Sequence, residues 1–536
     1  MFLNALIIFK IMEESQKNLQ EEIIDFLVKN SNLVLIAILI FGFYLRFKYL
    51  NINTAIWWDE GEYLSIAKEW AFGINYEVPS VRQPLVPLLI SLLYKIGISN
   101  LSIIKFFVVL LPSIASVFLT YLIGKELYNK QIGLISSFIM SVFWVSLFWT
   151  TRVSTDLMGL FFSLLAFWSF WKGYIKKENP KLYLSITGIA LALGFTTRVG
   201  NILTIIIIGI FLIFIARFEI FKNKSLRYLI IFSILAVAPY LIWNQIKFGN
   251  IFAFWGIYTK SINTFATPIF WGFFKFFKLY LLNIFFIFFL FGALTYYKAF
   301  LGLDILLKKK SDELLADFFI ILMILVPTIY FSFILRQTSA EPRWAIVMAP
   351  AIFIITAKGF NTLYKISIKY LPEFNYKKII SIIAIITLII PASLQEIDYS
   401  DSLINSKKDS YIQLKLAGEW IKENSDKEDI IMSSAVPQNS YYSERKTIQV
   451  TGTEDYFNGL ISELKPKFLE LTILEGYPEW AFNWPENHRN LVIPVQAYFS
   501  DPERTKAVLV IYEFVDYPDK KTNTITNMDT GIEERQ

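Results

Sequence analysis

Three carboxylates stand close together in the sequence WWDEGEY of residues 57–63, directly after the apolar segment 33–47. Carboxylates beside a membrane-spanning helix are costly, so they are candidates for function. Asp59 and Glu60 are neighbours, and on a helix or turn their side chains point in different directions. One carboxylate can therefore act on a substrate as a base while the other binds a cation or an amide. The alternative is a solvated cluster, with Glu62, in an aromatic belt at the membrane interface.

A fourth carboxylate, Asp156, opens the apolar segment 157–172 and follows Thr155. A Thr-Asp pair is well suited to cap a helix N-terminus, which is the simpler explanation for it. The functional alternative is that Asp156 and Glu62 bind an acceptor or a metal ion. Oxygen ligands favour a hard cation such as Mg²⁺ or Mn²⁺, for which Asp59 and Asp156 are the candidate ligands.

Arginines provide the complementary charge. Arg82 follows the acidic segment, Arg198 lies between two apolar segments, and Arg343 opens another. A guanidinium group matches the geometry of phosphate oxygens and stays charged when partly desolvated. Each arginine could instead extend to lipid headgroups. Carboxylates and arginines at one lipid-facing surface suit a substrate that is a phosphate-bearing lipid.

The composition sets the class of protein that holds these residues. Of 536 residues 55% are hydrophobic and 17% aromatic, which is typical of a polytopic helical membrane protein. Cysteine is absent and His488 is the only histidine, so thiolate sites, disulfides and histidine-built zinc sites are excluded. The net charge of +6 lies mostly in loops between spans and indicates topology rather than a nucleic-acid partner. No cleavable signal peptide is evident.

About eleven membrane spans are expected at roughly 20 residues per crossing. The Pro-containing apolar segment 84–97 is short for a span and is expected at the membrane surface or in a re-entrant position. The predicted spans are 33–47, 101–124, 131–150, 157–172, 182–196, 200–216, 228–244, 279–297, 317–335, 344–358 and 379–394.

The distribution of lysine and arginine predicts the orientation. Most basic loops, such as the one with Lys308, Lys309 and Lys310, fall on one side of the membrane, which is cytoplasmic by the positive-inside rule. The N-terminal segment 1–32 lies on that side. The carboxylates and everything after about 395 then lie outside the cell membrane.

Four segments of the chain are expected to differ in structure. Residues 33–394 form the membrane domain, whose first external loop, 49–100, carries the acidic segment. A soluble α/β domain of residues 395–517 follows outside, with a helix at 411–424 and β-like runs. These runs are 429–433, 446–450 and 507–514. The polar tail 518–536 is expected to be disordered.

Several motifs follow one another in the order that one family of membrane enzymes shows. They are Asp59-Glu60 after the first span, RQPLVP at 82–87, Thr155-Asp156 before the fourth span, Arg198, PYLIWN at 239–244 and FGN at 248–250. Through them the chain resembles the C-type membrane glycosyltransferases, close to the protein O-mannosyltransferase and aminoarabinose transferase group (glycosyltransferase family 39). The resemblance covers most of 33–394. The family usually has two adjacent prolines where this chain has Pro84 alone. The tail lacks the sequence WWDYG, which argues against an oligosaccharyltransferase.

The resemblance implies a glycosyltransferase that moves one sugar from a polyprenyl or dolichyl phosphate to a hydroxyl group of a protein, lipid or glycan. Asp59 would be the base, with Glu60 beside it as the second catalytic carboxylate. Arg198, Arg343 and Arg82 would bind the donor phosphate. A single displacement implies inversion at the anomeric carbon.

Two other functions use the same residues. A transporter or lipid flippase would use the carboxylates as ligands, but no internal repeat is evident and the carboxylates lie at the interface. The other alternative is a polymerase-like or ligase enzyme of similar architecture. An archaeal or bacterial cell membrane is expected rather than a eukaryotic one.

Overall fold

The computed structural model describes residues 30–74, 82–217, 222–254, 270–297, 311–335, 341–371, 377–501 and 503–517. The predicted tail 518–536 and nearly all of the predicted N-terminal segment 1–32 lie outside these residues. The chain forms two compact units. Unit 1 comprises Met1–Asn51, Gln83–Leu85 and Lys105–Asn405, and unit 2 comprises Ile52–Arg82, Val86–Ile104 and Ser406–Gln536.

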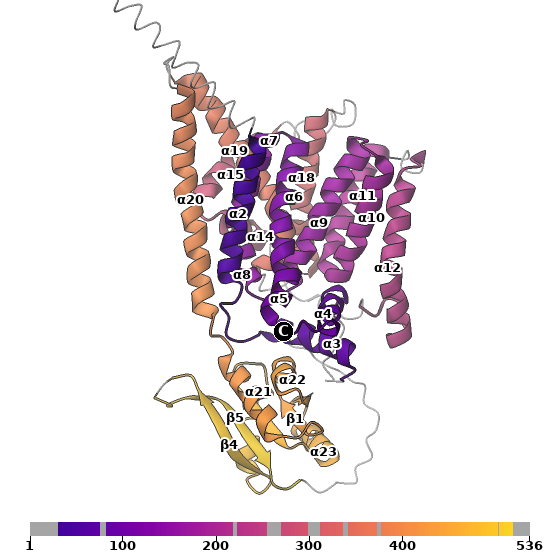
Figure 1. The fold of residues 1–536 in the computed structure, drawn as a ribbon, viewed down its shortest axis with the longest axis vertical. Helices are drawn as coiled ribbons and strands as arrows, with labels where there is room; N and C mark the ends of the chain where they lie inside the picture. The colour runs from indigo at the N-terminus through magenta and orange to yellow at the C-terminus, as the bar shows by residue number, and fades with distance from the viewer. Residues whose placement is uncertain are drawn as a thin grey trace, which may run out of the picture. The chain divides into compact units, whose positions relative to one another are not determined.

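Unit 1 is a bundle of helices that run side by side (Figure 1). In chain order, with the short helical segments that join them, its elements are α2 (Ser31–Tyr49), η1 (Phe106–Leu110), α6 (Leu111–Leu127), α7 (Lys130–Val142), α8 (Trp144–Thr150), α9 (Asp156–Phe170), η2 (Trp171–Ile175), α10 (Pro180–Thr197), η3 (Val199–Asn201), α11 (Ile202–Ala216), α12 (Leu226–Phe248), α14 (Phe270–Leu281), α15 (Ile284–Leu294), α18 (Asp312–Ile329), η5 (Tyr330–Leu335), η6 (Pro342–Met348), α19 (Ala349–Tyr370) and α20 (Lys377–Lys407). The short helix α5 (Leu101–Lys105) precedes η1 and belongs mostly to unit 2.

These helices confirm the predicted fold class. Seven of the described helices are long and apolar enough to cross a membrane, or eight if α7 and α8, bent by 48°, form one span. Each of the eleven predicted spans overlaps a described helix, but the span predicted at 279–297 falls on the end of α14 and the short helix α15, with a break between them. The segment 84–97, predicted to be too short to span, contains the short apolar helix α4 (Leu85–Lys95).

Close backbone packing fixes the helix that follows Arg343. A Cβ added to Gly292 on α15 would collide with the carbonyl oxygen of Ile355, and one added to Gly359 on α19 with that of Phe288. Small residues at such crossings let membrane helices approach closely. On the same helix, Lys358 Nζ lies 2.8 Å from Asp317 Oδ1 of α18, and both side chains are buried. Helix α19, and with it the turn η6, is therefore held firmly in the bundle.

Unit 2 contains α3 (Trp58–Phe72), α4 and an α/β domain. The five-stranded sheet has the order β2-β1-β3-β5-β4, in which β1 is parallel to β2 and β3, and β5 is antiparallel to β3 and β4. Its elements are α21 (Ile412–Asn424), β1 (Ile430–Ser433), α22 (Val436–Ser443), β2 (Lys446–Gln449), α23 (Glu454–Leu464), β3 (Phe468–Thr472), α24 (Trp484–Asn487), β4 (Val492–Phe499) and β5 (Ala507–Phe514).

The sheet is covered on both faces by buried apolar side chains. One cluster includes Met432, Leu469 and Trp484, and the other includes Ile431 and Ile511. The predicted helix at 411–424 and the three predicted β-like runs are present as α21, β1, β2 and β5. Two strands, β3 and β4, were not predicted. Strand β4 contains Pro494, which lacks a ladder donor and makes a strand hard to recognise.

The first external loop and the α/β domain belong to one compact unit. The predicted boundary between 394 and 395 lies inside the continuous helix α20, whereas the compact units divide after Asn405. Most of the predicted loop 49–100 is grouped with the residues after 405. The acidic segment is therefore positioned by the soluble domain as well as by its own helix.

Candidate active site

Helix α3 places the acidic segment in its first turn. It begins at Trp58, and the Glu60 carboxylate Oε2 accepts a hydrogen bond from the backbone N–H of Trp57 at 3.0 Å. A carboxylate at this position satisfies a free donor and interacts favourably with the helix dipole. Glu60 is only 2% exposed. Its carboxylate thus stabilises the start of the helix that carries Asp59.

Asp59 and Glu62 lie three residues apart on one face of α3, where they share Arg82. The distance from Arg82 Nη2 to Asp59 Oδ1 is 2.9 Å, and Arg82 Nε donates to Glu62 Oε2. Glu62 also accepts a hydrogen bond from Trp58 Nε1 at 3.1 Å through its other oxygen. We call Asp59, Glu62 and Arg82 the carboxylate cluster.

The two acids of the carboxylate cluster differ in exposure. The Asp59 side chain is 28% exposed, against 8% for Glu62. Burial raises the pKa of Glu62 above its ordinary value. The positive charge of Arg82 lowers this pKa, and the negative charge of Asp59 raises it. Burial lowers the pKa of Arg82, but Glu62, Tyr63 and Asp59 together raise it above its ordinary value. Arg82 therefore stays protonated, and Asp59 is the more accessible acid.

The opposite side of α3 packs on helix α22 of the soluble domain. A Cβ added to Gly61 would lie 2.8 Å from the carbonyl carbon of Pro437, so the two backbones are in close contact. Lys68, two turns further along α3, lies 3.0 Å from Glu444 at the end of α22. A larger residue at position 61 would push the helix away from its support.

A second set of predicted residues gathers in unit 1. Asp156 is the first residue of α9 and is 3% exposed. Arg198, which follows α10, contacts Asp156 Oδ1 through Nη1, and Arg343 Nη1 lies 3.8 Å from Asp156 Oδ2. Arg343 Nε also lies 2.6 Å from Glu341. We call Asp156, Arg198 and Arg343 the arginine cluster.

The ends of three helical segments bring the arginine cluster together. The backbone of Arg198 is extended where α10 ends, and Arg343 stands in the turn η6, with its guanidinium carbon 4.3 Å from the ring centre of Trp149. A cavity of about 20 Å³ beside Asp156 and Arg198 has room for about one water molecule.

The structure groups the predicted site residues as two sets. Asp59 and Glu62 are found with Arg82, and Asp156 is found with the other two arginines. Arg82, predicted to bind phosphate, has two carboxylate partners instead. Asp59 and Asp156, the predicted cation ligands, both have arginine partners. Among the described residues no three or more Asp, Glu or His side chains gather as a metal site.

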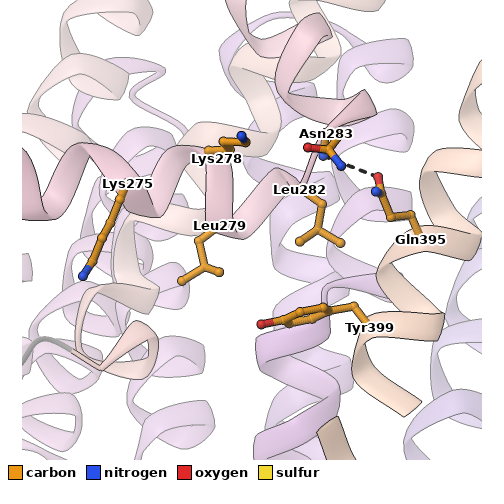
Figure 2. A pocket seen from close by; sticks show the side chains of 7 residues that line it. All are labelled: Lys275, Lys278, Leu279, Leu282, Asn283, Gln395 and Tyr399. Atoms are coloured by element: carbon orange, nitrogen blue, oxygen red, sulfur yellow. Dashed lines mark hydrogen bonds between the residues drawn. The ribbon is translucent and has the colours of Figure 1, made fainter. Parts of the chain in front are cut away.

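A larger cavity in unit 1 includes residues that the sequence did not single out. It has a volume of about 480 Å³ between α14 and α20. Figure 2 shows Leu279, Leu282 and Tyr399 pointing toward one another, with Lys275 at the edge and Lys278 pointing away from them. The lysines stand three residues apart within a Phe-rich run, and this spacing is the sequence signal that could have identified them.

Comparisons with known proteins agree with this fold. The family model described as dolichyl-phosphate-mannose-protein mannosyltransferase matches residues 78–243, a stretch that includes Arg82, Asp156 and Arg198. No curated protein sequence matches the chain.

Solved structures of two membrane proteins have a similar fold. ArnT from Cupriavidus metallidurans, solved with undecaprenyl phosphate bound, is 10% identical, with a TM-score of 0.63 over 89% of this chain and 97% of that one. The oligosaccharyltransferase AglB from Archaeoglobus fulgidus, in complex with an inhibitory peptide and a dolichol-phosphate, is 12% identical. Its TM-score is 0.58 over 93% of this chain and 75% of that one. The family model covers about a third of the chain, and the two solved structures show that the chain shares their fold.

Proposed function

We propose that the chain transfers one sugar from a polyprenyl or dolichyl phosphate to a hydroxyl acceptor on the extracytoplasmic side of the membrane. The grouping of charges supports it best: two carboxylates share one arginine around Asp59, and two arginines, one of which also contacts the exposed Glu341, gather at Asp156. ArnT and AglB bind polyprenyl phosphates, and AglB has also been solved tethered to an acceptor peptide.

Asp59 is the proposed base. It accepts the proton of the acceptor hydroxyl as the acceptor oxygen forms its bond to the anomeric carbon. The bond between that carbon and the phosphate oxygen breaks, and its electron pair stays on the phosphate. One displacement inverts the configuration of the anomeric carbon. Arg82 and Glu62 hold Asp59 in position, and Glu60 holds the start of its helix.

Arg198 and Arg343 are the proposed partners of the donor phosphate. Guanidinium groups stabilise the charge that develops on the leaving oxygen, so no acid has to protonate it. Asp156 orients both arginines while neutralising only part of their charge. Arg82, also predicted to bind phosphate, is assigned to positioning because Asp59 and Glu62 already occupy its fork.

The apolar cavity at α14 is the proposed site for the lipid chain of the donor. Its volume of about 480 Å³ lies in the range of ordinary ligand pockets. Tyr280, adjacent to the lining residue Leu279, donates a hydrogen bond to the carbonyl oxygen of Pro342, next to Arg343. Helix α14 therefore connects the cavity with the arginine cluster.

Transfer of radiolabelled sugar tests the proposal. Purified full-length protein in liposomes is given polyprenyl-phosphate sugars, beginning with mannose because of the matched family, and a mixture of hydroxyl acceptors. Label is expected to move from the lipid to an acceptor with inverted configuration. Movement of the labelled lipid across the bilayer without transfer would instead support the flippase alternative.

The orientation is tested separately. Ser311 precedes α18 and Lys427 follows α21, and both side chains are exposed. Cysteines introduced at these two positions are expected to react with an impermeant reagent from opposite sides, with Lys427 outside. Labelling of both from one side would contradict the proposed extracytoplasmic site.

A further inference from the structure

The carboxyl edge of the parallel strands in unit 2 has the features of a ligand site. The chain passes from β1 through α22 to β2 on one side, and then returns to β3 on the other side of β1. At such a reversal α/β sheets commonly bind ligands beyond the carboxyl ends of the strands, here β1 and β3. Glu475 follows the end of β3, and Gln438 stands in α22.

Glu475 and Gln438 form a fixed pair at this edge. Gln438 is fully buried and donates from Nε2 to Glu475 Oε1 at 2.6 Å. Glu475 is partly exposed. Buried Gln438 therefore positions a carboxylate whose remaining surface is open to a ligand.

The same edge contains buried polar oxygens that the fold does not satisfy. Buried polar groups normally have hydrogen-bond partners, so each exception calls for an explanation such as bound water or a ligand. The side-chain oxygens that are buried here and have no hydrogen-bond partner among the described residues are Ser434 Oγ, Gln438 Oε1, Asn439 Oδ1 and Ser440 Oγ.

Helix α3 packs against this edge. Gly61 lies against the backbone of Pro437 and Gln438, and Asp59 is in the first turn of the same helix. Burial raises the pKa of Glu475 to about 7. The hydrogen bond from Gln438 lowers this pKa, and the negative charge of Asp59 raises it. The proposed base and Glu475 therefore share one electrostatic environment.

This environment is acidic. Asp59, Glu60, Glu62 and Glu475 are accompanied by Arg82, while Lys68 is paired with Glu444. Carboxylates accept hydrogen bonds from hydroxyl groups, and an excess of negative charge disfavours an anionic ligand. Trp57 and Trp58, partly exposed, adjoin the site and offer apolar ring faces. An uncharged sugar fits this combination better than a phosphorylated headgroup.

We propose that Glu475, held by Gln438, binds the acceptor beside Asp59, and that the acceptor group is an uncharged sugar. This inference rests on the proposed function for the role of Asp59, but binding of the sugar can be measured without transfer. Glu475 is then a binding residue and Gln438 a positioning residue.

The test compares full-length wild type with Glu475→Gln and with the matched control Glu479→Gln. Glu479 lies in the same loop, is exposed and belongs to neither cluster. The acceptor probes are octyl mannoside, its 6-phosphate and a Ser/Thr peptide. Glu475→Gln is isosteric and can still accept the hydrogen bond from Gln438, so folding should be retained and is checked by thermal unfolding.

Above pH 7, where the Glu475 carboxylate is charged, Glu475→Gln is expected to raise the acceptor KM for octyl mannoside about tenfold or more, since a hydrogen bond to a charged group is lost. The donor KM should not change, and Glu479→Gln should behave as wild type. Gln438→Leu should also raise the acceptor KM, but less. An unchanged acceptor KM in Glu475→Gln, or preferred use of the phosphorylated probe or the peptide, would overturn the inference.

Titration calorimetry with octyl mannoside separates this inference from the proposed function. Loss of mannoside binding in Glu475→Gln alone supports the site, and equal binding by all three proteins overturns it. A wild type that binds the mannoside through Glu475 but transfers no sugar from any polyprenyl phosphate would overturn the proposed function and leave the acceptor site standing.

Discussion

The carboxylate cluster of unit 2 and the arginine cluster of unit 1 contain the same kinds of groups in opposite proportions. In the first, one arginine contacts two carboxylates. In the second, two arginines contact one buried carboxylate, and Arg343 also contacts the exposed Glu341. Asp59 is also much more exposed than Asp156. A salt bridge alone does not indicate function, but an exposed acid suits the proposed base and a pair of arginines suits the proposed phosphate contact.

The largest effect is expected for the exposed acid of the carboxylate cluster. Asp59→Asn keeps the size of the side chain and removes the proton acceptor, so the rate of transfer should fall about a hundredfold to ten-thousandfold. Donor binding should persist. Single-turnover transfer measures the rate, with Glu69→Gln on the same helix as the control. Near-normal transfer would show that Asp59 is not the base.

The arginine cluster should respond in affinity rather than in rate. Arg198→Lys and Arg343→Lys keep the positive charge beside Asp156 but lose the planar fork that matches phosphate. The donor KM is expected to rise about tenfold for each, the equivalent of roughly 1.4 kcal/mol. The exposed Arg227→Lys serves as the control. If both variants bind the donor as wild type does, the phosphate is held elsewhere.

The stability of unit 2 should also depend on pH. Burial raises the pKa of Glu470 in β3 to about 7, although hydrogen bonds from Ser433 and Asn439 lower it. The folded state thus holds a proton that the unfolded state releases between about pH 4.5 and 7, so stability falls as pH rises through this range. Glu470→Gln should remove up to about 3 kcal/mol of this dependence.

Calorimetry of the full-length protein from pH 5 to 8 measures the effect on the unfolding of unit 2. The control is Glu479→Gln, which keeps Glu470 intact. An unfolding temperature of unit 2 that is equally pH-dependent in wild type and Glu470→Gln would show that the Glu470 carboxyl does not bind this proton.

A smaller effect is expected for Glu60, the second carboxylate predicted to be catalytic. Glu60→Gln retains an oxygen that can accept from the Trp57 N–H, so transfer should stay within a few-fold of wild type. Glu60→Ala loses the hydrogen bond and should cost about 1 kcal/mol of stability, as loss of a helix cap does. The rate of sugar transfer is measured for both variants. An inactive Glu60→Gln beside an active Asp59→Asn would exchange the two roles.

The smallest effect is expected on removal of metal ions. Because arginines already neutralise Asp59 and Asp156, EDTA should change the rate of transfer little. A divalent cation at these residues stays a prediction from the sequence, and it would be supported by a loss of transfer that Mg²⁺ or Mn²⁺ restores. The transfer rate of Arg198→Lys with and without EDTA shows whether the positive charge comes from the arginine or from a divalent cation.

The sequence by itself determined the class of fold and the identity of most candidate groups. In a membrane the backbone N–H and C=O groups must bond within the protein, and a run of about 20 apolar residues achieves this as a helix. The spans therefore follow from composition. The spacing of Asp59 and Glu62 places both on one helix face, and Glu60 at the start of α3 is typical of a capping residue. These are local properties, because they depend on residues that are close together in the sequence.

Only the tertiary structure decided which groups meet. Arg82 reaches Asp59 and Glu62 from 20 or more residues away, and Asp156, Arg198 and Arg343 come from three helix ends. Glu475 lies more than 400 residues after Asp59 and was not singled out at all. Such contacts depend on how helices and strands pack against one another, which hydrophobic periodicity does not encode. The grouping of charges in each cluster, and hence its chemistry, emerges only from that packing.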